Sequence, residues 1–129
     1  MSTDGLIRGV DFASLPTRNF DSAVDFYGTT LGLTRSAYHP DRHFAEFETG
    51  NLTLSVVMPD AMGFEYKPNA NPVALHVEDI EAARATLEER GVSFQGETFD
   101  TSVCYMAFFS DPDGNALMLH HRYAPRVAD

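Results

Sequence analysis

Cysteine and tryptophan are scarce in this chain, and each shortage narrows the chemistry that it can perform. Tryptophan is absent, which excludes indole stacking on a planar ligand. The only cysteine, Cys104, excludes an internal disulfide framework. Because Cys104 lies in the apolar segment Cys-Tyr-Met-Ala-Phe-Phe, we expect a buried structural thiol rather than a nucleophile.

Long apolar runs and basic residues are also in short supply. No run approaches the ~18 apolar residues that a membrane-spanning helix needs. The first nine residues lack a basic region followed by an apolar stretch, so we expect no secretory signal and a cytoplasmic location. Nineteen Asp and Glu against nine Lys and Arg give a formal charge of −10. This charge opposes binding to nucleic acids or anionic membranes, so neither is an expected partner.

The first half of the chain has the pattern of one strand, one helix and three strands. Residues 7–15 have the pattern of a strand, and Asn19 or Asp21 can then cap a helix that ends at Leu31-Gly32-Leu33. Turn residues separate the three extended stretches that follow, which are 33–38, 43–48 and 52–58.

The second half repeats this pattern after a stretch rich in proline, glycine and asparagine. The segment Asn19–Ala23 aligns with Asp79–Ala83 at an offset of 60 residues, and Gly50 aligns with Gly114 at an offset of 64. The repeat predicts two βαβββ modules in one α+β domain over residues 1–129. We place the first module at 7–58, a linker at 59–71, the second module at 72–121 and a C-terminal tail at 122–129.

Several motifs of the chain resemble those of the vicinal oxygen chelate superfamily, which includes glyoxalases, bleomycin-resistance proteins and dioxygenases. They are the segment Ala23–Tyr27 followed by Leu31–Leu33, the segment Val77–Ala83, and the turn Phe109-Ser-Asp-Pro-Asp-Gly-Asn115. The resemblance implies that the two modules form a curled, half-open mixed sheet around a cavity. It also implies that the cavity is often completed in a homodimer, and that the enzymes of the group hold a divalent metal there.

The metal-ligand positions that this resemblance implies hold unsuitable residues. The family's histidines would fall at Phe12 and Pro72, and its carboxylates at Leu54 and Met118. Only Met118 offers a donor atom, a thioether that suits copper(I) rather than an oxygen-chelating metal. A shift of one residue brings in Ser55, which is still a poor ligand. We therefore expect no metal of the family type, and no other cofactor is indicated.

Strand alternation would direct a mainly apolar set of side chains into the cavity. The predicted ligand-binding residues are Phe12, Ser14, Leu54, Pro72, Ala74, His76, Met118 and His120. His76 and His120 are either polar contacts at the rim or structural histidines, whereas His121 should face away. Residues 38–42 and 59–72 would shape the pocket, and the sequence does not specify how.

The leading functional hypothesis is a metal-independent protein that binds an apolar or aromatic organic molecule, similar to the bleomycin-resistance branch. A second hypothesis is a lyase, isomerase or cyclase that uses His76 or His120 as acid or base. Against the second, we expect no carboxylate near these histidines to orient them. A third is a metal-dependent glyoxalase or dioxygenase whose ligands lie in another register. Whether the chain is an enzyme therefore stays open, with a homodimer as the expected assembly.

Overall fold

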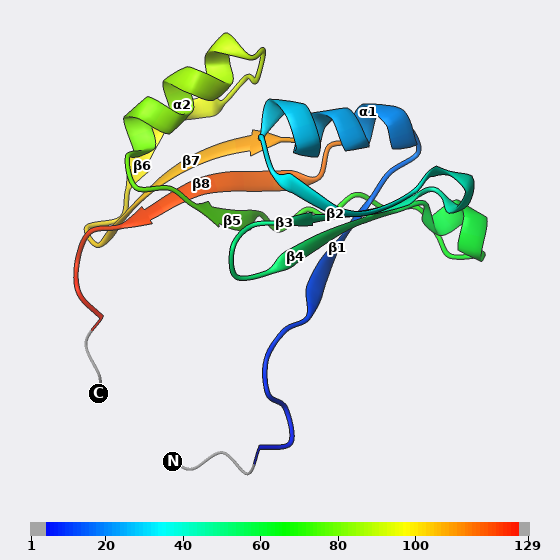
Figure 1. Cartoon of the computed structure of the whole chain (residues 1–129). Coiled ribbons are helices and arrows are strands. Elements are labelled where there is room, and N and C mark those ends of the chain that lie inside the picture. Colours follow the sequence, from blue (N-terminus) through cyan, green and yellow to red (C-terminus); the bar gives the residue numbers. More distant parts are fainter. Residues whose placement is uncertain (1–4, 127–129) are drawn as a thin grey trace.

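The computed structural model describes residues 5–126 and contains two four-stranded sheets with helices on one side of them (Figure 1). The first module forms one sheet in the order β1-β4-β3-β2, with β1 parallel to β4 and the other pairs antiparallel. Its elements are β1 (Phe12–Pro16), α1 (Phe20–Asp25), a π-helical turn (Phe26–Thr30), β2 (Thr34–His39), a 3-10 turn (Pro40–Arg42), β3 (Phe44–Glu48) and β4 (Thr53–Val57).

The second module repeats this topology in the order β5-β8-β7-β6, after a linker that begins with a 3-10 turn (Pro59–Met62). Its elements are β5 (Val73–His76), α2 (Ile80–Glu89), β6 (Gln95–Asp100), β7 (Cys104–Ser110) and β8 (Ala116–Arg122). The predicted α+β fold of two βαβββ modules is therefore confirmed. No helix between residues 5 and 126 has the length and apolar character needed to cross a membrane.

Both helices begin at the caps that the sequence predicts. The side chain of Asn19 accepts a hydrogen bond from the Ser22 amide at 3.2 Å, and that of Asp79 accepts one from the Ala82 amide at 3.0 Å. Each bond satisfies an amide that has no partner inside the first helical turn. The first helix ends differently from the prediction, because its last turn widens to a π-helix that the Leu31 amide closes on the Phe26 carbonyl at 2.9 Å.

Two strands are displaced from their predicted bounds. The strand expected over residues 7–15 begins only at Phe12, because β4 pairs with β1 from that residue onward. The repeated pattern also predicts a strand directly after Gly91, from Val92, but this strand starts at Gln95, because Val92 is buried and its amide bonds to the Leu87 carbonyl at 3.0 Å. Val92 thus closes the end of α2 before the chain becomes extended.

The hydrophobic core lies between the helices and the sheet faces that they cover. In the central strands, alternate side chains such as Phe47 and Leu54 in the first module and Phe109 and Leu117 in the second are at most 1% exposed. These residues belong to one continuous cluster, in which Phe26 of the first module packs on Phe109 with ring centroids 6.5 Å apart. The modules therefore share a core.

A buried polar network also joins the modules, and it is built by the turn between β7 and β8. The Tyr27 hydroxyl donates to the Asp111 carboxylate at 2.6 Å, and the Asn115 side-chain amide donates to the same carboxylate at 2.8 Å and to the Pro16 carbonyl at 2.9 Å. The Asn69 amide donates to the Asn115 oxygen at 2.8 Å. The motif that carries the family resemblance thus connects both modules and the linker.

Candidate functional site

Most of the predicted ligand-binding residues lie on the sheet faces that point away from the helices. Ala74 and Met118 are register partners in the parallel pair β5–β8, as are His76 and His120. These four alternate with the covered residues of their strands and are partly or fully exposed. Phe12 is 52% exposed, and Ser14 shares its face in the other sheet. The residues named above therefore form a surface that the helices of this chain do not cover.

Leu54 and Pro72 do not lie as the sequence suggested. The expectation that Leu54 points to the same open side is wrong, because Leu54 is fully buried toward the helices. The strand β4 starts three residues after Gly50, whereas β8 starts two residues after Gly114, so the two turns differ by one residue. Ser55, which is 2% exposed, therefore occupies the position of β4 that points away from the helices. Pro72 precedes β5 and is exposed.

The family's metal positions therefore do not fit a divalent metal that chelates oxygen. With the corrected register, these positions hold Phe12, Ser55, Pro72 and Met118. This set offers a hydroxyl and a thioether but no imidazole or carboxylate, the donors that such metals take. No step of a reaction is assigned to a metal at these positions.

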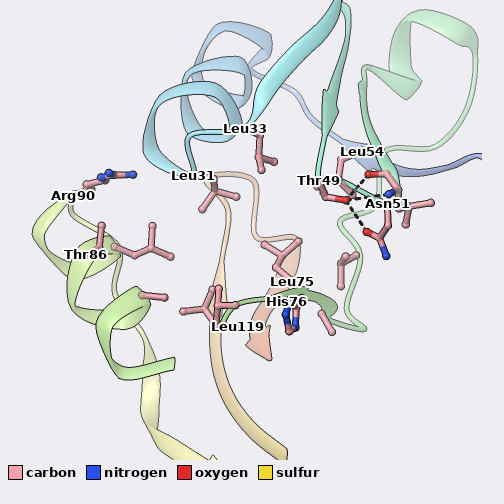
Figure 2. A pocket seen from close by; sticks show the side chains of 17 residues that line it. Leu31, Leu33, Thr49, Asn51, Leu54, Leu75, His76, Thr86, Arg90 and Leu119 are labelled. Carbon is pink, nitrogen blue, oxygen red and sulfur yellow. Dashed lines mark hydrogen bonds between the residues drawn. The ribbon is translucent and has the colours of Figure 1, made fainter. Parts of the chain in front are cut away.

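A cavity of about 650 Å³ lies between the two modules. Figure 2 shows Leu31 and Leu33 on one wall and Leu75 and Leu119 opposite them, with α2 closing one side. The lining is mainly aliphatic and consists of Leu31, Leu33, Thr49, Gly50, Asn51, Leu52, Leu54, Val73, Ala74, Leu75, His76, Val77, Ala83, Thr86, Leu87, Arg90 and Leu119. None of these residues is Phe, Tyr or Trp.

Only three predicted ligand-binding residues border this cavity: Leu54, Ala74 and His76. Ala74 and His76 border it although they face the open side, because β5 is an edge strand. The sequence reasoning missed the leucines after α1 and the inner face of α2. Their only signals were the Leu31-Gly32-Leu33 motif and the helical spacing of Ala83 and Leu87.

Polar groups stand at two ends of the cavity. At one end, Thr49 donates its hydroxyl proton to the Leu52 carbonyl at 2.6 Å and so holds the β3–β4 turn (Figure 2). At the other end, the Arg90 guanidinium donates to the Thr30 carbonyl at 2.9 Å and bridges α2 to the first module. Arg90 therefore brings a positive charge to the rim of an aliphatic cavity.

The histidines at the ends of β5 and β8 have neighbours that the sequence did not indicate. His76 Nε2 lies 3.0 Å from the Glu78 carboxylate, so the expectation that no carboxylate could orient these histidines is wrong. Burial lowers the pKa of His120, and the nearby His76 lowers this pKa further. His121 was expected to face away from His76, yet their ring centroids are 6.1 Å apart.

Cys104, the only cysteine, is buried at 5% exposure, as the sequence predicts for a structural thiol.

Comparison with known proteins places this geometry in a family. The family model of the Glyoxalase/Bleomycin resistance protein/Dioxygenase superfamily matches residues 9–119. No curated protein matches the chain. Among solved structures, TnmS3, an antibiotic binding protein from Streptomyces sp. CB03234, is 30% identical with a TM-score of 0.76, and the match covers 91% of this chain and 98% of that one.

Two further solved structures have the same fold. A superfamily member from Sphaerobacter thermophilus is 28% identical with a TM-score of 0.75, and the match covers 89% of this chain and 98% of that one. Lactoylglutathione lyase from Agrobacterium tumefaciens is 16% identical with a TM-score of 0.73 over 89% and 94% of the two chains, which shows a shared fold alone. The chain belongs to the Glyoxalase/Bleomycin resistance protein/Dioxygenase superfamily.

Proposed function

We propose that the chain is a small-molecule binding protein that holds an apolar organic ligand between its modules, without a metal at the family's positions. The observation that carries the proposal is the cavity of about 650 Å³ with its aliphatic walls. This volume lies within the range of roughly 300–1,000 Å³ that is typical of small-molecule sites. Burial of apolar ligand surface against these walls supplies the affinity.

The similarity to TnmS3 supports the same class of function, because that protein binds an antibiotic. The cavity walls narrow the ligand class further. Since none of the 17 lining residues is Phe, Tyr or Trp, the ligand is held by aliphatic contacts rather than by ring stacking. An acidic or other electron-rich group on the ligand would suit the end near Arg90.

Replacing Ala83 by phenylalanine tests whether the cavity is the ligand site. Ala83 is partly buried on the face of α2 that lines the cavity, so a phenyl ring there takes up space that a ligand needs. The probe is anilinonaphthalene sulfonate, an apolar anion whose fluorescence rises in apolar surroundings, titrated in the presence of EDTA. We expect the wild type to bind it and Ala83→Phe to bind it at least about tenfold more weakly, a change of about 1.4 kcal/mol.

Ala85→Phe is the matched control, because Ala85 is exposed on the same helix and does not line the cavity. Circular dichroism melting establishes that both variants are folded. Equal affinity of Ala83→Phe and Ala85→Phe for the probe contradicts the proposal, as does binding that EDTA abolishes.

The proposal includes a homodimer in the cytoplasm. Apolar side chains near the start of the chain support the dimer, because Ile7 is 83%, Val10 71% and Phe12 52% exposed. Figure 1 shows this segment extending away from β1 on the side opposite the helices. Light scattering is expected to give twice the chain mass of 14.3 kDa. Val10→Asp combined with Phe12→Asp should shift the mass to one chain, and a wild-type monomer at all concentrations contradicts the dimer.

A further inference from the structure

We propose that His76, Glu78 and His121 form a binding site for a divalent transition-metal ion of the zinc class, away from the family's metal positions. One ligand atom from each of the three side chains lies within 4.8 Å of the other two. His76 Nε2 and the Glu78 carboxylate oxygen are 3.0 Å apart. His76 and His121 lie on the adjacent strands β5 and β8, and Glu78 follows β5 by two residues.

The backbone holds these side chains in place. His76 is the last residue of β5, and Glu78 follows two positions later, outside the strand. The Val77 amide donates to the His120 carbonyl at 3.0 Å, which continues the pairing with β8 beyond the strand end. Two ligands therefore come from one segment and the third from the neighbouring strand.

The hydrogen bond of His121 prepares its ring for metal binding. Its Nδ1 lies 3.1 Å from the Val77 carbonyl oxygen, which can only accept, so Nδ1 carries the proton. Nε2 is then the nitrogen with a free lone pair. Metal-ligating histidines commonly donate their other ring proton to a backbone carbonyl in this way, which fixes the ring and its tautomer.

The donor set matches the zinc class in type and number. Zinc takes imidazole nitrogen and carboxylate oxygen at about 2.0–2.2 Å in tetrahedral geometry, which places ligand atoms about 3.4 Å apart. Small side-chain rotations bring the cluster to that spacing. Three protein ligands leave the fourth position for water or a ligand oxygen. The acidic chain, with a formal charge of −10, also favours a cation.

This cluster is distinct from the positions that the family uses. His76 lies four residues beyond Pro72, the position that corresponds to a family ligand. The alternative is a surface ion pair between His76 and Glu78, whose side chains are 68% and 86% exposed. Such a pair stabilises little and makes no use of His121. A metal site depends on His121, and this difference separates the two interpretations.

Zinc titration of the untagged full chain tests the site, by calorimetry and by competition with a chromophoric chelator. We expect one Zn²⁺ per chain, and at least tenfold weaker binding in His76→Ala and in His121→Ala. His39→Ala is the control for non-specific binding to surface histidines. His120→Ala tests the assignment of the third ligand, because its histidine neighbours His121 but lies outside the cluster. Both controls should bind zinc as the wild type does.

Zinc affinity of His121→Ala equal to that of the wild type overturns the site, as does loss of binding in His39→Ala. Loss in His120→Ala overturns the assigned ligand set. Melting without metal checks that each variant is folded, and a zinc-induced rise in melting temperature should be absent in His121→Ala. Binding of anilinonaphthalene sulfonate by Ala83→Phe is measured separately in EDTA, so failure of the metal site and failure of the proposed ligand site are distinguishable.

Discussion

Replacing Asp111 by alanine is expected to lower the free energy of unfolding by at least about 3 kcal/mol. The carboxylate is 6% exposed and accepts four hydrogen bonds, from the Tyr27 hydroxyl, the Asp113 amide, and the amide and side chain of Asn115. The substitution leaves several of these donors buried without a partner, and each such donor costs about 1–3 kcal/mol. The loss should exceed that of an ordinary surface substitution because the network joins both modules.

Urea unfolding followed by circular dichroism measures this loss. Asp41→Ala is the matched control, because Asp41 lies in an exposed turn, and its removal should change the free energy of unfolding by at most about 0.5 kcal/mol. Asp111→Asn keeps the shape and one acceptor oxygen, so its loss should fall between the two. If Asp111→Ala is as stable as Asp41→Ala, the network does not hold the modules together.

The two modules could be predicted because their signals are local in the sequence. Asn19 and Asp79 can cap a helix wherever the chain places them, because the amides that they bind are three residues away. Glycines after each helix mark its end, and turn residues separate the strands. Their repetition at offsets of 60 and 64 residues then indicates a duplicated topology without any knowledge of tertiary contacts.

The register of β4 could not be predicted from the repeat, because one residue reverses every side chain of a strand. The segment between Gly50 and β4 is one residue longer than the segment between Gly114 and β8, and this difference exchanges Leu54 for Ser55 on the open face. In the second module the alternation was correct, and Ala74 and His76 share a face with Met118 and His120. The hydrophobic pattern of the sequence does not reveal such a difference in the length of a turn.

The cavity and the histidine cluster escaped prediction for a different reason. Leu33, Leu87 and Arg90 meet only because the two modules pack together, and no spacing within either module specifies that packing. Glu78 lies beyond the end of β5, where strand alternation no longer constrains the direction of a side chain. The approach of His121 to His76 depends on the same strand ends. These features arise from tertiary structure alone.

Tyr27 should make the protein increasingly unstable at alkaline pH. Its side chain is fully buried, and burial raises its pKa above the ordinary value, as does the negative charge of Asp111. Above pH ~10 the unfolded chain releases this proton while the folded chain retains it. The folded state then binds more protons, so the free energy of unfolding decreases as pH rises, by up to about 1.4 kcal/mol per pH unit. Below pH ~10 this contribution is fully present.

Urea unfolding of the wild type and of Tyr27→Phe between pH 8 and pH 11 isolates this contribution. Phenylalanine has no proton to release, so the free energy of unfolding of Tyr27→Phe should decrease less steeply above pH 10, although the variant is less stable by about 1 kcal/mol at pH 8. Tyr66, whose pKa is raised to about 12 chiefly by burial, also bonds to an acidic side chain but is nearer the surface. By the same linkage, Tyr66→Phe should also make the decrease above pH 10 less steep. Tyr38→Phe, at a tyrosine that is 40% exposed, is the matched control and should follow the wild-type curve. Parallel pH curves for wild type and Tyr27→Phe contradict the assignment, since the alkaline loss would then come from other groups and the Tyr27 hydroxyl would not be held protonated by the core.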